Sequence, residues 1–135
     1  MKRLPVMITP SWVSTPTQPI ALEDIARYLA GVAGNDAASG ETFDAGGPEV
    51  MTYRQMIERI AALLGRRPRI IEVPVLTPAL SALWLELVTP VNASVARPLV
   101  DGLRSPTVAH EERLRKLLPF LLTPFDEAAR RGIED

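Results

Sequence analysis

A helix with clear start and end signals constrains the fold of this chain more than any other stretch. Thr52 stands just before an apolar-periodic run, and Gln55 follows three residues later. The Thr hydroxyl can accept from the Gln55 N–H while the Gln side chain accepts from the Thr52 N–H, which is the capping box. Gly65 permits the left-handed conformation that ends a helix. The sequence therefore predicts a helix from Thr52 to residue 64, with one apolar face made of Met56, Ile57, Ile60, Ala61 and Leu64.

The residues before this helix predict a strand and a turn. Residues 41–45 suit a short strand. Gly46 and Gly47 permit positive φ, and Pro48 cannot donate to a sheet ladder, so the three residues predict a turn. We interpret this strand–turn–helix as a packing unit, because it carries no reactive side chain of its own.

Composition limits the classes of protein that this chain can belong to. Its 135 residues predict one domain, residues 1–135, and 47% apolar residues are enough to build a core. There is no cysteine and one histidine, which excludes disulfides, thiolate nucleophiles and cysteine-based metal sites. A net charge of −1 is unlike the basic footprint of a nucleic-acid binder. No apolar run reaches the length of a membrane span. We expect a cytoplasmic protein with no metal, no nucleic-acid partner and no membrane span.

The rest of the chain predicts short elements separated by prolines. Helical periodicity and β-branched runs alternate along it. Together they predict an α/β protein that is predominantly helical, with about six helices and about three short strands. The further strands are expected at residues 4–8 and 69–73, and the further helices at residues 21–32, 79–88, 92–104, 108–118 and 124–131.

A search for catalytic motifs finds none. No G-x-G-x-x-G turn, P-loop or serine-hydrolase motif is present, and neither tyrosine has a lysine four residues on. Glu23 and Asp24 lie in the first turn of a predicted helix, where the helix dipole favours acids. His110 is expected to be a solvated helix residue. We therefore predict no catalytic residue, and no cofactor bound by this chain.

Three arginines, Arg66, Arg67 and Arg69, follow the capped helix. DNA contact by this helix is disfavoured, because a recognition helix needs a partner helix and a positive face. Bidentate guanidinium contacts could instead bind a phosphate or a carboxylate. The alternative is a solvated loop, and the sequence leaves both open.

Several motifs together resemble a known family. They are M-I-T-P-x-W-V at 7–13, T-Q-P-I-A at 17–21, F-D-A-G-G-P at 43–48 and I-I-x-V-P at 70–74. Their order resembles the C-terminal, substrate-side half of an extended, atypical short-chain dehydrogenase/reductase. It is similar to NAD(P)-binding nucleoside-diphosphate-sugar epimerases and to the nucleotide-binding accessory subunit of respiratory complex I.

The resemblance implies a division of labour with a Rossmann half that carries the cofactor fingerprint and the active-site Tyr and Lys. This chain would lack that half, and NAD(P) would bind to the intact parent protein. The segment from Thr9 to Gln18 would lie at the edge of a small-molecule substrate pocket, with Thr9, Trp12, Gln18 and Pro19 as candidate pocket residues.

Two functional hypotheses remain open. The first is the substrate-side segment of an NAD(P)-dependent epimerase-like or reductase-like protein, not catalytic alone. The second is a non-enzymatic helical interaction or scaffold module. In either case we expect a homodimer, because the predicted helix at residues 79–88 is apolar on most sides and the helix face from Leu22 to Leu29 would lack its cover.

Overall fold

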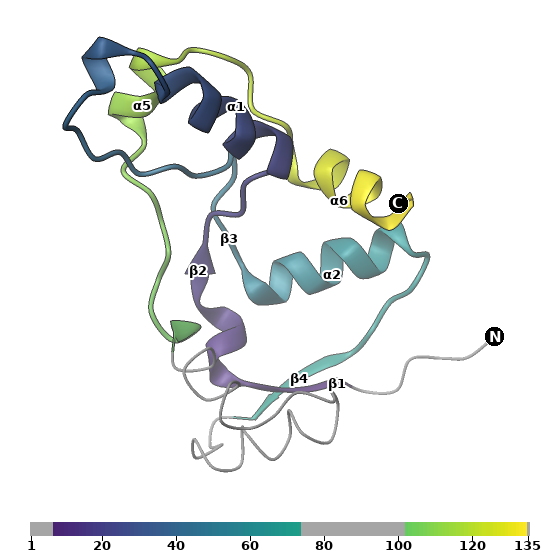
Figure 1. Ribbon diagram of the computed structural model, residues 1–135. Helices are drawn as coiled ribbons and strands as arrows, with labels where there is room; N and C mark the ends of the chain where they lie inside the picture. The colour runs from purple at the N-terminus through teal and green to yellow at the C-terminus, as the bar shows by residue number, and fades with distance from the viewer. Residues whose placement is uncertain (1–6, 74–101, 135) are drawn as a thin grey trace, which may run out of the picture. The chain divides into compact units, whose positions relative to one another are not determined.

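The computed structural model describes residues 7–73 and 102–134, and these fall into two compact units (Figure 1). The described residues of the first unit are 7–16, 52–73 and 102–106. Those of the second unit are 17–51 and 107–134. The chain passes between the units within β2 (Pro16–Thr17) and β3 (Met51–Thr52), which form a two-stranded sheet. The prediction of a single domain stays a prediction.

The first unit is built on a parallel pair of strands. β1 (Met7–Pro10) pairs with β4 (Ile70–Val73), with Met7 opposite Ile70. This confirms the strand predicted at 69–73. A 3-10 helix, η1 (Ser11–Ser14), follows β1 and packs against α2 (Tyr53–Leu63). The buried apolar residues in the described part of this unit are Val13, Ala61 and Ile70.

The start and end of α2 confirm the prediction made from its sequence. The Thr52 hydroxyl accepts from the Gln55 N–H at 3.2 Å, and the Gln55 side-chain oxygen accepts from the Thr52 N–H at 2.8 Å. Gly65 has φ of 66°, and the Arg66 N–H donates to the Ala61 carbonyl at 2.7 Å. These bonds satisfy backbone groups that a helix otherwise leaves without partners at its two ends.

Thr52→Ala is expected to destabilise the chain by about 0.5–2 kcal/mol, because it removes the acceptor for the Gln55 N–H. Chemical denaturation gives the measurement. Thr42→Ala is a matched control, since Thr42 lies in an irregular, exposed stretch outside any helix. Equal unfolding midpoints for wild type and Thr52→Ala would show that this cap does not hold the helix in solution.

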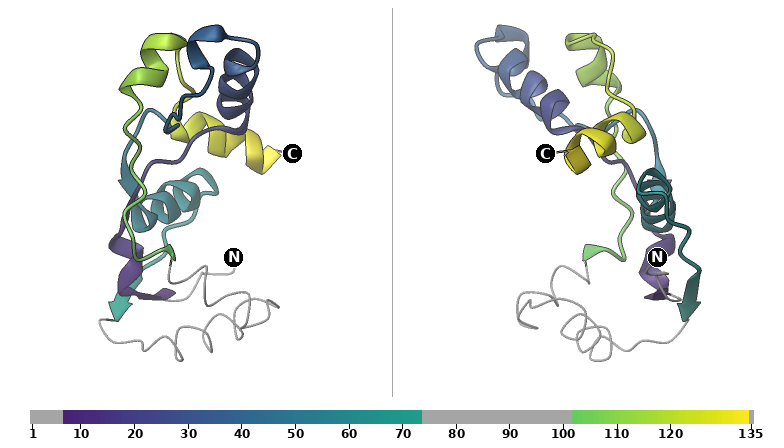
Figure 2. Two further views of the ribbon diagram at one scale, coloured as in Figure 1. Left: turned by 60° about the vertical axis from the view of Figure 1, so that its left-hand side comes forward. Right: turned by 90° about the vertical axis from the view of Figure 1, so that its right-hand side faces the viewer.

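The second unit contains three α-helices (Figure 2). They are α1 (Leu22–Val32), α5 (Glu112–Leu117) and α6 (Phe125–Glu134), and a short 3-10 helix, η2 (Asp36–Ala38), follows α1. The core is Tyr28, Leu114 and Leu122, with partly buried apolar residues around it. The helices predicted at 21–32 and 124–131 are confirmed, and α6 continues three residues further than expected.

The strand predicted at residues 41–45 is wrong. No strand is assigned there, and the segment is irregular. Phe43 and Ala45 do pack against the core of the second unit. A strand also needs a neighbouring strand for its N–H and C=O groups, and no local pattern shows whether one is present.

The turn at Gly46–Gly47 needs glycine for a different reason from the one predicted. Neither glycine has positive φ; among the described residues only Gly34, Gly40 and Gly65 do. Both glycines instead lie where residues 18–20 approach the backbone too closely for a side chain to fit. A Cβ on Gly46 would lie 2.6 Å from the Gln18 side-chain Cδ, and one on Gly47 would lie 2.8 Å from the Pro19 carbonyl carbon.

The helix predicted at residues 108–118 is too long. Only Glu112–Leu117 is helical, as α5. The Ala109 N–H donates to the Gln18 side chain at 2.9 Å and the His110 N–H donates to Asp44 at 3.2 Å. These long-range acceptors hold the preceding residues outside the helix, and sequence periodicity does not include them.

Among the described residues there are four α-helices, against about six predicted for the whole chain. The predicted helix at 79–88 lies outside the described residues, as does the one at 92–104 apart from residues 102–104. No helix of the described part is both long and apolar enough to cross a membrane.

Two apolar side chains of α1 are exposed in the described part of the chain. Leu22 is 82% exposed and Leu29 is 63% exposed, whereas Asp24 and Tyr28 on the same helix are buried.

Candidate functional site

The residues predicted for a substrate pocket are divided between the two units. Thr9 and Trp12 belong to the first unit, and Gln18 and Pro19 belong to the second. The three loop arginines are also in the first unit. Each group is described within its own unit.

Thr9 and Trp12 carry buried polar atoms for which the described residues provide no hydrogen-bond partner. Thr9, in β1, is 2% exposed, and its hydroxyl finds no hydrogen bond within the described part of the chain. Trp12, in η1, packs edge-on against Tyr53 with ring centroids 5.9 Å apart. Its buried Nε1–H is also without a partner there. Buried polar groups are almost always paired, so a hydroxyl and an indole N–H left free three residues apart are unusual. They could donate hydrogen bonds to a ligand oxygen.

Gln18 uses all of its side-chain polar groups inside the second unit. Its Nε2 donates to the Gly47 carbonyl at 2.8 Å and to Glu111 Oε1 at 3.0 Å, while its Oε1 accepts from the Ala109 N–H at 2.9 Å. These partners lie 29 to 93 residues away in the sequence. Gln18 therefore joins its own segment to Gly47 and to the segment at residues 109–111.

The Gly46–Gly47 turn does not fit a dinucleotide. A glycine-rich turn binds a pyrophosphate by presenting free backbone N–H groups at a helix N-terminus. Here Gly46 faces the Gln18 side chain and Gly47 faces the Pro19 carbonyl oxygen. A carbonyl oxygen is a hydrogen-bond acceptor and repels phosphate. The turn is a packing contact between two segments of the second unit.

Asp24 lies in the first turn of α1, as predicted, and it is also buried. Its side chain is 0% exposed, and its Oδ2 accepts from the Thr123 N–H at 2.6 Å. That bond ties α1 to the residues that lead into α6. Its Oδ1 has no hydrogen bond in the described chain, and Arg27 approaches it only to 4.0 Å. The Asp24–Tyr28 spacing of four, which puts both on one helix face, was the available signal.

Tyr28 and Glu111 continue this buried polar cluster. Burial raises the pKa of Tyr28, the charge of Arg115 opposes that rise, and the charges of Glu111 and Asp24 add to it. The phenol is therefore neutral at physiological pH, and its hydroxyl has no described partner. Glu111 binds Arg115 at 2.6 Å through Oε1 while its Oε2 is left unpaired. The cluster has the polar groups of a binding site, but its bonds serve to hold segments together.

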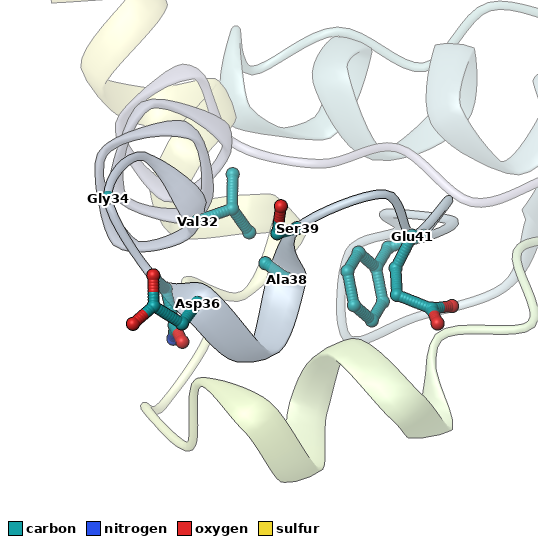
Figure 3. A pocket seen from close by; sticks show the side chains of 8 residues that line it. Val32, Gly34, Asp36, Ala38, Ser39 and Glu41 are labelled. Atoms are coloured by element: carbon teal, nitrogen blue, oxygen red, sulfur yellow. The ribbon is translucent and has the colours of Figure 1, made fainter.

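A shallow pocket of about 330 Å³ lies beside the C-terminal end of α1 (Figure 3). Figure 3 shows the carboxylates of Asp36 and Glu41 on opposite sides of it. Glu41 already binds Arg113 at 2.6 Å, and the Asn35 side chain accepts from the Ala37 N–H at 3.0 Å. None of the predicted site residues lines it, and its lining is Val32, Gly34, Asn35, Asp36, Ala38, Ser39, Glu41 and Phe43.

The three loop arginines lie between α2 and β4 and are all exposed. No ion pair joins any of them to another residue of the described part. The other notable arginines differ: Arg54, Arg113, Arg115 and Arg131 all bind carboxylates within their own units. In the described part, no group of three or more acidic or histidine side chains is placed to hold a metal ion.

The fold is similar to that of a known reductase. No protein-family model and no curated protein matches the chain. Among solved structures it is similar to Citrobacter sp. triphenylmethane reductase, studied for the bioremediation of triphenylmethane dyes, with a TM-score of 0.71 and 14% sequence identity. The match covers 95% of this chain and 45% of that one, so the chain spans less than half of the solved protein.

This likeness is one of fold alone. It shows an α/β fold like that of part of this reductase, in line with the α/β class predicted from the sequence. The particular family implied by the motifs stays a prediction.

Proposed function

We propose that this chain is the substrate-side segment of an NAD(P)-dependent protein of the nucleoside-diphosphate-sugar epimerase or reductase type. The observation that carries the proposal is the fold match, which takes in nearly all of this chain and less than half of a reductase. The remainder of such a fold would supply the cofactor site, and this segment would cap the substrate pocket without catalysing a reaction alone.

Within this proposal, Thr9 and Trp12 contact the substrate. Support comes from the Thr9 hydroxyl and the Trp12 indole N–H, two buried groups of one short segment that find no partner among residues 7–73 and 102–134. They suit a hydroxyl or carbonyl oxygen of a small polar substrate. Gln18 and Pro19 do not contact the substrate in this proposal but support the surrounding structure. Gln18 is fully hydrogen-bonded within its unit, and the Pro19 carbonyl packs on Gly47.

Cofactor, assembly and location follow as parts of the same proposal. NAD(P) belongs to the intact parent protein, which is cytoplasmic. The exposed Leu22 and Leu29 side chains favour a covering partner for α1, and we propose a homodimer. The same surface also favours the alternative function, a non-enzymatic interaction module that binds through α1.

The 135-residue chain alone is expected to show no measurable affinity for NADH or NADPH. The physical reason is that Gln18 and Pro19 pack against its one double-glycine segment, which leaves no space there for a phosphate group. Isothermal titration calorimetry with each nucleotide gives the measurement, and adenosine is the control for nonspecific stacking. Micromolar affinity for either dinucleotide would contradict the proposal that the cofactor binds outside this chain.

A further inference from the structure

The two units carry opposite charge. The described residues of the first unit include six arginines and two glutamates, which gives a net charge of +4. Those of the second unit include eleven acidic residues and six basic ones, a net charge of −5. The overall charge of −1 is therefore small because a basic unit and an acidic unit offset each other. Half of the described arginines of this unit are in one short loop, at positions 66, 67 and 69.

The backbone of this loop is fixed at both ends. At the helix end, Gly65 is in the left-handed conformation and the Arg66 N–H donates to the Ala61 carbonyl at 2.7 Å. At the strand end, the Arg69 carbonyl accepts from the Met7 N–H at 2.9 Å. Pro68 restricts φ between the arginines. The guanidinium groups therefore project from a short, anchored backbone, which reduces the entropy lost when they bind a ligand.

The charge of the loop is not neutralised within the described part of the chain. The carboxyl-terminal end of α2 attracts cations, but a helix dipole provides only about half a charge. Three positive charges in four residues repel one another and are exposed to solvent. A carboxylate brings one negative charge, whereas a diphosphate brings two or more with several oxygens for bidentate guanidinium contacts.

We propose that Arg66, Arg67 and Arg69 form a binding site for the diphosphate group of a small molecule. The contacts are fork-like hydrogen bonds from the guanidinium groups to phosphate oxygens. The site is independent of the proposed substrate-side role, since it rests on a loop of the first unit and not on the fold match.

The test is calorimetric titration of inorganic pyrophosphate into the full chain, with orthophosphate and acetate as comparison anions. We expect pyrophosphate to bind best and acetate not to bind, and we expect its affinity to fall as salt is raised. Arg66→Gln/Arg67→Gln should weaken pyrophosphate binding on the order of tenfold or more, because it removes two bidentate donors. The matched control, Arg104→Gln/Arg130→Gln, removes two exposed positive charges elsewhere and should leave the affinity within about twofold.

Arg66→Lys/Arg67→Lys separates geometry from charge. It keeps both charges but loses the planar fork, so its affinity should fall between wild type and the glutamine variant. Urea denaturation of each variant checks that the fold is intact. The proposal is wrong if wild type gives no binding heat with pyrophosphate. It is also wrong if the control pair weakens binding as much as the loop pair, since the attraction would then follow net charge only.

Discussion

Gly47→Ala is expected to destabilise the second unit by about 3 kcal/mol, the upper part of the usual range for overpacking. A Cβ at this position would fall on the Pro19 carbonyl oxygen and lie 2.8 Å from its carbon, and 3.2 Å from the Ile20 Cα. All of these are backbone atoms, so no side-chain rotation can relieve the clash. The measurement is the free energy of unfolding from urea denaturation.

Gly132→Ala is the control for this substitution. A Cβ on Gly132 meets nothing within 4 Å, and the residue lies within α6, where Ala is the better helix former. We expect this variant to be as stable as wild type or more stable by about 0.5–1 kcal/mol. If Gly47→Ala had the stability of wild type, the close approach between residues 18–20 and 46–47 would be absent in solution.

Asp24→Ala is expected to cost about 2 kcal/mol, within the range for a hydrogen bond to a charged group. The substitution leaves the Thr123 N–H without its acceptor and releases the segment before α6 from α1. Asp24→Asn keeps an oxygen for that N–H and gives the unpaired position a donor, so it should be milder. Denaturation monitored by far-UV circular dichroism gives the unfolding free energies.

The neighbouring acid provides the contrast. Glu23 is exposed and binds Arg131 at the surface, where solvent screens the pair, so Glu23→Ala should change stability much less than Asp24→Ala. Equal effects at the two positions would mean that both acids act only through the helix dipole, which is how the sequence alone was interpreted.

The parts of the fold that depend on neighbouring residues could be predicted from the sequence. The cap at Thr52 and Gln55 and the stop at Gly65 act within a few residues, and the structure has all of them. The β-branched run before Val73 is likewise a strand, β4. The α/β class, which the structure shares with part of a solved reductase, was also predicted from the sequence.

The parts that depend on distant partners could not be predicted. Residues 41–45 alternate as a strand does, but the backbone is irregular. Residues 108–111 are kept out of α5 because the Ala109 and His110 N–H groups donate to Gln18 and Asp44, which are more than 60 residues away. Asp24 suited the helix dipole by position, and only the fold shows that it is buried against Thr123. The loop arginines are exposed, and the backbone bonds that fix their loop at both ends were not visible in the sequence.

The most direct test of the substrate-side role is titration of NADH and NADPH into the product of the complete reading frame that contains this chain. We predict about 150 coding residues upstream with a G-x-x-G-x-x-G turn, and micromolar binding of one of the two nucleotides by calorimetry. A reading frame without that turn, or a longer product that binds neither nucleotide, would contradict the role and favour the interaction module.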